Sequence, residues 1–392
     1  MTSFEQVKEK CDRYLFHNYG RQEIAFTHGK GCYLYDTEGK EYLDLVAGIA
    51  VNALGYAHPD WVAAVQAQAA RMAHVSNLYY VEQQGELAER IASIAPAGID
   101  RTLFVNSGAE ANEAALKMAV KYTGRRKIMS ALDGFHGRTS AALGATGQKK
   151  YQSGFEPLIS DAYEYFPYGD AEAVKKMITK DVAAVIVEPI QGESGVITAP
   201  AEFFKAVRDL CTDSGALMIV DEVQTGIGRT GEWYGIQNFG VVPDAITMAK
   251  ALGGGVPIGA VSSTEEFSST MTPGTHGTTF GGSPLVCTAG CATLDIMKRD
   301  RIVEHSKSLG EEWRSKIRAI PSDKIREVRG YGLMTGIEMD SPETASMIQR
   351  ECRDRGILVN VAHGKTLRLV PPLIITSEQT DVFTDALADI LS

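Results

Sequence analysis

Two apolar segments near the middle of the chain each end in a charged residue of a kind that cofactor chemistry uses. The first, residues 216–220, runs into Asp221, and the second, residues 245–249, runs into Lys250 and then the glycines at 253–255. Both segments have the length and the flanks of strands that are buried on both faces. Ligands of open parallel sheets bind at the carboxyl ends of the strands, so we expect Asp221 and Lys250 to meet at one crevice.

An amine and a carboxylate at one crevice match the requirements of pyridoxal phosphate. The amine can hold the cofactor's aldehyde as a Schiff base, and the carboxylate can keep the pyridine nitrogen protonated so that the ring accepts electrons. Most Lys and Asp side chains are exposed to solvent, however, and two such charges considered alone are better explained as surface residues. The choice between these interpretations depends on the other loops of the chain.

A serine–glycine turn follows the predicted strand at residues 102–105. Ser107 and Gly108 open a helix there, and the free N–H groups and positive dipole end of a helix N-terminus suit a phosphate. Ser107 and Glu110, three residues later, also have the spacing of an ordinary capping box, which is the simpler explanation of this motif alone. The turn is compatible with both roles.

Three further loops carry side chains that suit a ring, a carboxylate or a phosphate. In the first, Phe135 could cover a face of a pyridine ring and Arg138 could fork onto a substrate carboxylate, although packing and solvent exposure are commoner roles. Glu193 lies in a glycine-rich loop, where it is either a partner for an arginine or a solvated acid. Residues 276–282 offer two threonine hydroxyls to a phosphate, or simply link two domains. The joint occurrence of these loops favours a cofactor site.

Helical stretches alternate with short apolar runs from about residue 61 to about residue 262, which predicts an α/β fold with a doubly wound, largely parallel sheet. A hairpin pattern at residues 31–44 and a glycine-rich stretch at 48–55, expected to be a loop, precede it. A long helical pattern from Pro284 leads to a C-terminal part that resembles a small α+β unit. The predicted strands of the large sheet are residues 102–105, 127–131, 182–187, 216–220, 245–249 and 258–261.

These patterns divide the chain into three parts. Residues 1–60 are assigned to the N-terminal part of a small domain, and Pro59 and Asp60 precede a helical pattern that runs to about Arg71. Residues 61–283 are assigned to a large α/β domain that binds the cofactor. Residues 284–392 are assigned to a linking helix and the C-terminal part of the small domain.

Composition excludes several classes of function. The 392 residues carry a net charge of -10, which argues against a nucleic-acid surface. No run reaches the ~18 apolar residues of a membrane helix, and the start lacks the pattern of a signal peptide, so we expect no membrane contact and a cytoplasmic location. The six cysteines are scattered, and although Cys287 and Cys291 are four apart, nothing nearby completes a metal site. We expect no metal.

Together these residues resemble the class III, or ω-amino, aminotransferases, which are pyridoxal-phosphate enzymes of fold type I. The resemblance covers essentially the full chain. Its most specific parts are residues 221–231, residues 243–245 and residues 249–255, and residues 106–112 support it. The resemblance implies a large, mostly parallel sheet domain, a small α+β domain built from both termini, and transfer of an amino group between two small molecules.

The resemblance also implies roles at the cofactor ring. Lys250 would form the internal aldimine and carry a proton between the substrate carbon and the cofactor, and burial would lower its pKa from the usual ~10.4 for this purpose. Asp221 would pair with the pyridinium nitrogen. Val223 and Phe135 would enclose the ring, and Gln224 would reach its phenolic oxygen.

The phosphate and the substrates have implied partners as well. The phosphate would bind at residues 107–109, that is Ser107, Gly108 and Ala109, with help from Thr279 of a neighbouring subunit, so a homodimer is expected. Arg138, with Thr278 nearby, would anchor a carboxylate of the amino donor. Arg368 would take a carboxylate of glutamate or 2-oxoglutarate, and Glu193 would be its switchable partner.

Two functions from other classes fit the sequence less well. A nicotinamide-dependent dehydrogenase would have Gly-x-Gly-x-x-Gly after a strand with an acid about twenty residues later, and no predicted strand has this sequence. A binding protein that had kept the fold without the chemistry would be expected to lack Lys250 or Asp221.

Overall fold

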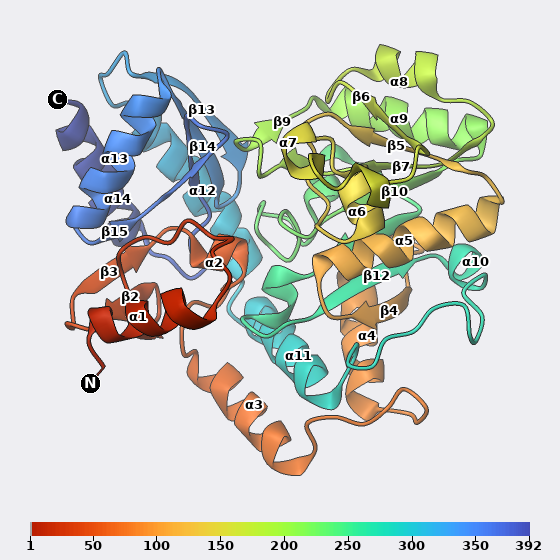
Figure 1. Ribbon diagram of the computed structural model, residues 1–392, viewed down its shortest axis with the longest axis horizontal. Helices are drawn as coiled ribbons and strands as arrows, with labels where there is room; N and C mark the ends of the chain where they lie inside the picture. Colours follow the sequence, from red (N-terminus) through yellow and green to blue (C-terminus); the bar gives the residue numbers. More distant parts are fainter. Residues whose placement is uncertain (1) are drawn as a thin grey trace.

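The structure, a computed structural model, describes residues 2–392 and is organised around one large sheet (Figure 1). The sheet has seven strands in the order β4-β12-β11-β10-β7-β5-β6. Neighbours among β11, β10, β7, β5 and β6 are parallel, and β12 is antiparallel to both of its neighbours. The prediction of a doubly wound, largely parallel sheet is confirmed. The strands are β4 (Arg101–Val105), β5 (Lys127–Ala131), β6 (Tyr163–Phe166), β7 (Val182–Val187), β10 (Leu217–Asp221), β11 (Ala245–Met248) and β12 (Gly259–Ser263).

The central strands are buried on both faces because alternate side chains pack against different helices. Val185 of β7 belongs to the same apolar cluster as Phe204 of α9 (Ala201–Ser214). Its neighbour Ala184 belongs to the cluster on the opposite face, together with Ala115 of α5. Successive residues of a strand point to opposite faces, so two apolar faces require a continuous apolar run. This is why the runs in the sequence identify these strands.

Strand β6 is absent from the strands expected from the sequence. It forms the edge of the sheet next to β5, and only Phe166 of its four residues is buried. The hydroxyl of Tyr165 donates a hydrogen bond to the carbonyl oxygen of Gly144 (2.7 Å). An edge strand that is half exposed needs no continuous apolar run, so the sequence Tyr-Glu-Tyr-Phe lacks the pattern of the central strands.

The part of the chain from Pro59 to Arg299 also contains helices, short helical turns and a two-stranded sheet made of β8 and β9. The helix expected after Pro59 and Asp60 and up to about Arg71 is present as α3, which begins at Pro59 itself. Helix α11 packs against both α3 and α4. These elements are α3 (Pro59–Arg71), α4 (Glu82–Ile94), α5 (Gly108–Thr123), α6 (Ser140–Ala145), α7 (Lys149–Gln152), η1 (Glu156–Leu158), α8 (Ala171–Met177), β8 (Ile190–Gln191), β9 (Ile197–Thr198), η2 (Gly235–Phe239), η3 (Lys250–Gly253), α10 (Glu265–Ser268) and α11 (Pro284–Arg299).

Both ends of the chain contribute to a smaller α+β region, on the left of Figure 1. The predicted hairpin is confirmed by the antiparallel strands β2 and β3, and β3 also pairs in parallel with β15. A second sheet has the order β13-β14-β17-β16. The elements are β1 (Phe26–Lys30), β2 (Tyr33–Asp36), β3 (Glu41–Asp44), α12 (Ile302–Arg318), β13 (Ile325–Tyr331), β14 (Met334–Met339), α13 (Pro342–Asp354), β15 (Ile357–Leu358), β16 (Asn360–Ala362), β17 (Thr366–Leu369) and α14 (Ser377–Leu391).

The stretch expected to be a loop at residues 48–55 overlaps a single helical turn, α2 (Ala47–Ala50). This turn is left-handed, with a positive φ at all of its residues, including 64° at Ile49. Left-handed backbone is costly for residues other than glycine, so the turn needs support. Asp44 supplies it by accepting hydrogen bonds from two backbone N–H groups at the start of the turn (2.8 and 3.0 Å) and from the hydroxyl of Tyr56 (2.6 Å).

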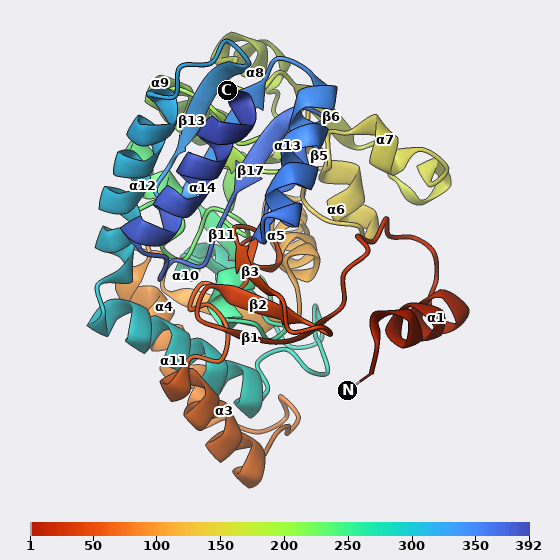
Figure 2. The ribbon, with the colours of Figure 1, turned by 90° about the vertical axis from the view of Figure 1, so that its left-hand side faces the viewer.

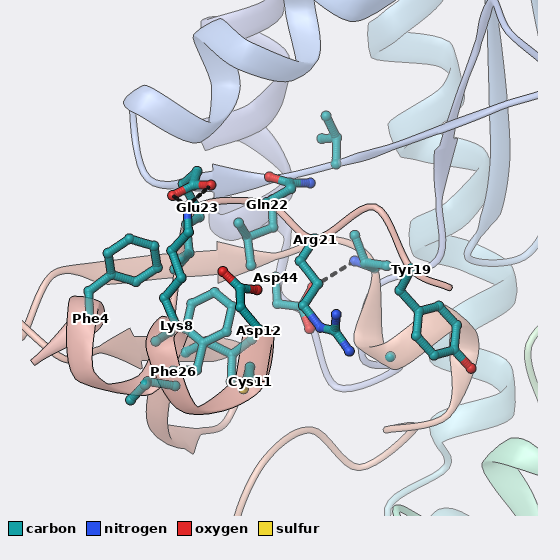
Figure 3. A pocket seen from close by; sticks show the side chains of 18 of the residues that line it. Phe4, Lys8, Cys11, Asp12, Tyr19, Arg21, Gln22, Glu23, Phe26 and Asp44 are labelled. Atoms are coloured by element: carbon teal, nitrogen blue, oxygen red, sulfur yellow. Dashed lines mark hydrogen bonds and ion pairs between the residues drawn. The ribbon is translucent and has the colours of Figure 1, made fainter. Parts of the chain in front are cut away.

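The N-terminal helix α1 (Phe4–Tyr14) stands apart from the rest of the molecule (Figure 2), and none of its residues is buried. A cavity of about 670 Å³ is lined by α1, by the segment that follows it and by parts of the small sheet. Figure 3 shows Lys8 in contact with Glu23 (2.6 Å) at one side of this cavity and Arg21 at the other. Phe16, just beyond α1, is 89% exposed.

Three global features follow from residues 2–392. No helix in this part of the chain combines the length and apolar character needed to cross a membrane. The six cysteines are free thiols. Among these same residues, no three His, Cys, Asp or Glu side chains are grouped so that they could hold a metal ion.

Helix α12 makes a close backbone contact that is sensitive to a single methyl group. A Cβ on Gly310 would lie 1.8 Å from the carbonyl oxygen of Gly332, in the turn between β13 and β14. Helix propensity favours Gly310→Ala by about 1 kcal/mol, but the clash pushes α12 away from the turn. We expect a net loss of about 1–3 kcal/mol in unfolding free energy, measured by urea denaturation. Ser308→Ala, on the exposed side of α12, is the control. An unfolding free energy that Gly310→Ala leaves unchanged would contradict the close contact with Gly332.

Candidate active site

The acid and the amine singled out in the sequence lie at the same edge of the large sheet. Asp221 is the last residue of β10, and Lys250 begins η3 just after β11. Strands β10 and β11 pair in parallel, with Asp221 opposite Thr247, so both carboxyl ends meet at one crevice. Lys250 has a φ of +44°. Left-handed backbone at a residue other than glycine stores strain, which directs attention to Lys250 as a functional position.

The surroundings of Lys250 favour its neutral amine. Burial lowers the pKa of Lys250 below its ordinary value, as expected from the sequence. The carboxylates of Glu193 and Asp221 oppose this shift, and the guanidinium of Arg368 adds to it. An amine with a lowered pKa is available as a nucleophile and as a proton acceptor closer to neutral pH than an exposed lysine.

Asp221 is fixed by a buried network of hydrogen bonds. Its Oδ2 lies 2.7 Å from Nδ1 of His136 and accepts a hydrogen bond from Nδ2 of Asn112 (2.8 Å). Its Oδ1 accepts one from the N–H of Val223 (3.0 Å). Asn112 is itself oriented by the hydroxyl of Thr247, which donates to its Oδ1 (2.7 Å). The carboxylate therefore has a single orientation at the end of β10.

The charge of Asp221 acts on His136. Burial opposes protonation of the imidazole, but the hydrogen bond and the charge of Asp221 outweigh burial and raise the pKa of His136 above its ordinary value. An imidazole with its proton on Nδ1 donates to Oδ2 of Asp221 and helps to fix the carboxylate in place. A buried carboxylate held in one orientation suits a protonated ring nitrogen as a partner.

The sequence assigns no role to three of these network residues. His136 lies between Phe135 and Arg138 in the same loop, and Asn112 is the last residue of the motif at 106–112. Thr247 is one residue of an apolar run. The signal that could have found two of them is a lone polar residue at a position where the pattern demands burial: Thr247 interrupts the run of β11, and Asn112 lies on the alanine-rich buried face of α5.

The turn before α5 is packed tightly against the strands beside it. Ser107 is the N-cap, and its hydroxyl accepts a hydrogen bond from the N–H of Glu110 (3.2 Å). The carboxylate of Glu110 binds the N–H of Asn106 (2.9 Å) rather than that of Ser107, so the expected capping box is only half formed. Gly108 and Ala109 occupy the first helical positions, whose N–H groups have no partner within the helix. The turn can therefore bind an anion.

Two loops meet beside this crevice through a residue that the sequence analysis did not single out. The buried carboxylate of Glu188 accepts hydrogen bonds from the N–H of Phe135 (2.9 Å) and from the N–H of Gly192 (3.4 Å). It thereby joins the loop that carries Phe135 to the loop that carries Glu193. Burial raises the pKa of Glu188 above its ordinary value.

The structure brings Arg368 and Glu193 into direct contact. Nη1 of Arg368 donates to the carboxylate of Glu193 (2.6 Å) and to Oε1 of Gln224 (3.2 Å). Nη2 of Arg368 donates to Oδ1 of Asn360 (2.8 Å). Burial alone would raise the pKa of Glu193, but the neighbouring guanidinium lowers it below its ordinary value. The pair is therefore ionised in this state.

The remaining predicted residues lie at the rim. Arg138 is exposed, and its guanidinium stacks 4.1 Å from the centre of the Tyr151 ring. The hydroxyl of Thr278 accepts a hydrogen bond from Nδ2 of Asn106 (2.9 Å), beside the start of α5. Thr279, the next residue, is exposed, as is Phe280. Thr279 makes no side-chain hydrogen bond to residues 107–109 among the described residues.

Comparison with known proteins identifies the family. The model of the family "Aminotransferase class-III" matches residues 15–391. The chain belongs to the class-III aminotransferase family. It is 46% identical over 386 residues to the acetylornithine aminotransferase of Methanosarcina mazei, covering 98% of this chain and 96% of that protein. It is 44% identical over 390 residues to the acetylornithine aminotransferase of Methanothermobacter thermautotrophicus, covering 99% of both chains.

Solved structures of other aminotransferases share the fold of this aminotransferase. The ornithine aminotransferase of Toxoplasma gondii has a TM-score of 0.95 at 31% identity, covering 100% of this chain and 95% of the other. The acetylornithine aminotransferase of Elizabethkingia anophelis has a TM-score of 0.89 at 32% identity, covering 100% of this chain and 99% of the other. The protein is thus a pyridoxal-phosphate-dependent aminotransferase of fold type I.

The described residues fit this cofactor. A fixed, buried carboxylate at Asp221 suits a protonated ring nitrogen, and the amine of Lys250 lies at the neighbouring strand end with a lowered pKa. The anion-binding turn depends on glycine, because a Cβ on Gly108 would lie 2.7 Å from Cγ1 of Val223. An amine, an acid and an anion site around one crevice match the aldehyde, ring nitrogen and phosphate of the cofactor.

The lowered pKa of Lys250 predicts how the apoprotein captures pyridoxal phosphate. We mix the two at a series of pH values, reduce with borohydride and measure bound cofactor by mass. Labelling should reach half of its maximum well below the ~10.4 of an ordinary lysine. Glu193→Gln should move this midpoint lower, because the carboxylate raises the pKa of Lys250. Lys250→Ala is the unlabelled control. If Glu193→Gln leaves the midpoint unchanged, the effect of the Glu193 carboxylate on the pKa of Lys250 is contradicted.

Proposed function

We propose that the protein transfers the side-chain amino group of N2-acetyl-L-ornithine to 2-oxoglutarate, giving N-acetyl-L-glutamate 5-semialdehyde and L-glutamate, a step of arginine biosynthesis. The Methanosarcina and Methanothermobacter relatives bear the name of this activity over nearly the full length of the chain. The structural observation that carries the proposal is the ion pair of Arg368 with Glu193 (2.6 Å) beside Lys250. It suits a pocket that accepts two unlike substrates in turn.

The residues around the crevice divide the chemistry among them. Bound pyridoxal phosphate supplies an aldehyde that carries the amino group from donor to acceptor and a ring that withdraws electrons from the reacting carbon. Asp221 keeps the ring nitrogen protonated, and His136 and Asn112 hold its carboxylate in place. Nζ of Lys250 would accept the proton of the substrate carbon that carries the amino group and would return it to the carbon of the cofactor's aldehyde group, for which its lowered pKa is suited.

The same residues that the family resemblance assigned to the cofactor are proposed to bind it here. Val223 and Phe135 enclose the ring, and Gln224 reaches the phenolic oxygen. The N–H groups and hydroxyl of residues 107–109 bind the phosphate. Thr279, which is exposed, adds its hydroxyl to the phosphate site of a neighbouring subunit.

Two arginines select the substrates. Arg138, with Thr278 nearby, binds the carboxylate of the amino donor at the rim. Arg368 binds a carboxylate of 2-oxoglutarate or glutamate, after Glu193 has turned away. While the donor is bound, Glu193 stays on Arg368 and neutralises it, so that the uncharged part of the donor does not face a bare cation. The two half-reactions thus place opposite demands on one ion pair.

A homodimer in the cytoplasm is part of the proposal. Leu78, Tyr79 and Tyr80 are 84%, 66% and 108% exposed, and Phe280 is 62% exposed. Nδ2 of Asn77 donates to the carbonyl oxygen of Gly281 (3.0 Å), which links the two segments. Contiguous exposed apolar side chains of this kind mark interaction sites, and here they flank Thr279. Sedimentation equilibrium, which gives the mass in solution, tests the dimer.

The division of the chain into residues 1–60, 61–283 and 284–392 is also proposed to describe its domains. The pairing of β3 with β15 supports the union of the two outer parts in one small domain, because Leu43 lies opposite Ile357. The seven-stranded sheet lies wholly within the middle part.

A panel of amino donors at fixed 2-oxoglutarate tests the proposed substrate. We expect the highest kcat/KM with N2-acetylornithine, followed by lower values with N-succinylornithine, ornithine, 4-aminobutyrate and acylated lysine precursors. Free ornithine is the second candidate, because the Toxoplasma structure bears the name ornithine aminotransferase. Arg138→Ala should lower kcat/KM for the donor roughly 10- to 100-fold through loss of a charge-assisted hydrogen bond. Equal activity with and without the acetyl group would refute the choice of donor.

Glu193→Gln tests the exchange at Arg368. The variant cannot neutralise the guanidinium, so the half-reaction with N2-acetylornithine should slow by about tenfold or more. The half-reaction with 2-oxoglutarate should be unchanged or faster, because the dicarboxylate no longer competes with a charged side chain. Stopped-flow absorbance of the cofactor measures both half-reactions separately. An unchanged ratio of the two rates would remove Glu193 from the exchange. Glu232→Gln is the control, because Glu232 is a half-buried acid that pairs with a different cation, Lys307 (2.7 Å).

A further inference from the structure

The loop that carries Glu193 ends in strained backbone. Gly195 has a φ of +102°, and Val196 has a φ of +59°. A β-branched residue in the left-handed region is a rare and costly conformation, which persists only where the surrounding structure holds it. The strand β9 begins directly after Val196 and lies beside β13 (Figure 1). The contacts that keep this loop in its strained conformation therefore come from the smaller α+β region.

Arg329 of β13 supplies this hold. Its Nε donates hydrogen bonds to the carbonyl oxygens of Gly195 (3.2 Å) and Val196 (3.1 Å), and its Nη2 donates to that of Gly195 (2.8 Å). Its Nη1 donates to the carboxylates of Glu327 (2.6 Å) and Glu338 (2.7 Å). The side chain is 8% exposed. Two acids fix the guanidinium from one side, and it binds two consecutive carbonyl groups of the strained turn on the other.

Strand register places Arg329 in line with Arg368, the arginine proposed to bind a substrate carboxylate. Arg329 lies opposite Gly336 of β14, and Gly336 lies opposite Arg368 of β17. Residues directly opposite one another in antiparallel strands project from the same face, so both arginines flank Gly336 on one face. A Cβ on Gly336 would lie 2.9 Å from the carbonyl oxygen of Gly195. The loop therefore rests on the sheet through the gap that this glycine leaves.

The two arginines hold opposite ends of the same loop. Nη1 of Arg368 binds the carbonyl oxygen of Gly192 (3.3 Å) and the carboxylate of Glu193. Arg329 binds the far end, at Gly195 and Val196. With that far end fixed, the backbone below Glu193 keeps its position, and release of Arg368 requires only rotation of the side chain.

We propose that Arg329 is a positioning residue that sets how readily Glu193 pairs with Arg368, and thereby sets the balance between the two half-reactions. The inference rests on the proposed exchange at Arg368. Arg329 is not catalytic, since its bonds go to the loop, to two acids and to the hydroxyl of Thr366 (3.4 Å). Without its hydrogen bonds the strained turn relaxes, and the carboxylate of Glu193 occupies its place on Arg368 for less of the time.

Arg329→Gln in the holoenzyme is the test. Pre-steady-state measurement should show the half-reaction with N2-acetylornithine slowed by about tenfold, as expected for the loss of charged hydrogen bonds, and the half-reaction with 2-oxoglutarate unchanged or faster. Arg329→Lys keeps the charge but cannot bind two carbonyl groups at once, so it should show a smaller effect of the same sign. Lys365→Ala is the matched control, because Lys365 contacts the same Glu338 (2.7 Å) without contacting the loop.

Hydrogen exchange gives a second readout that does not depend on activity. The amides of residues 192–198 should exchange faster in Arg329→Gln than in the natural protein, with and without cofactor, while those of β10 should not change. An equal slowing of both half-reactions, or unchanged exchange in the loop, would overturn the proposal.

A double variant separates this inference from the function on which it rests. If Arg329 acts through Glu193, Arg329→Gln should add nothing in a Glu193→Gln background. Additive effects would overturn the positioning role. If Glu193→Gln alone leaves the ratio of half-reactions unchanged, the exchange itself fails; if Glu193→Gln changes the ratio and Arg329→Gln does not, only the role of Arg329 fails.

Discussion

The parallel pairing of β10 with β11 is the constraint on which the site depends. It brings the end of one strand, Asp221, and the residue after the next strand, Lys250, to the same edge of the sheet. Neither residue has much freedom there, because Asp221 is bound by three groups and Lys250 lies in strained backbone. The spacing of the acid and the amine is thus a property of the strand register, which the apolar residues of both strands determine.

The large sheet and the small region contribute different things to the crevice. The sheet supplies the groups assigned to the cofactor: Asp221, Lys250 and the turn before α5. The small region supplies Arg368 from β17 and holds the loop of Glu193 through Arg329. Chemistry that is common to both half-reactions therefore rests on the rigid sheet. In the proposed exchange, discrimination between the two substrates lies at the contact of Arg368 with Glu193, which is made of hydrogen bonds and charges.

Sequence reasoning found what local pattern encodes. Buried strands appear as apolar runs, and Asp221 and Lys250 stand at their ends, so these could be predicted. Edge strand β6 lacks such a run, and the left-handed turn α2 depends on a buried acid, Asp44, whose role is visible only in three dimensions. Asn112 binds Asp221, and Thr247 in turn binds Asn112, although Thr247 lies 135 residues further along the chain than Asn112. No local pattern records such a contact, and a polar residue in an apolar run is its only trace.

The pairing of β3 with β15 joins the two ends of the chain in one small sheet. During synthesis, β1, β2 and β3 leave the ribosome long before β15 exists, and contacts between distant segments are the slow ones to form. The large sheet, by contrast, is complete once β12 has been made. The edge of β3 that pairs with β15 therefore stays unpaired until β15 has been synthesised. Completion of the sheet that contains β3 is therefore possible only after all strands of the large sheet have been synthesised.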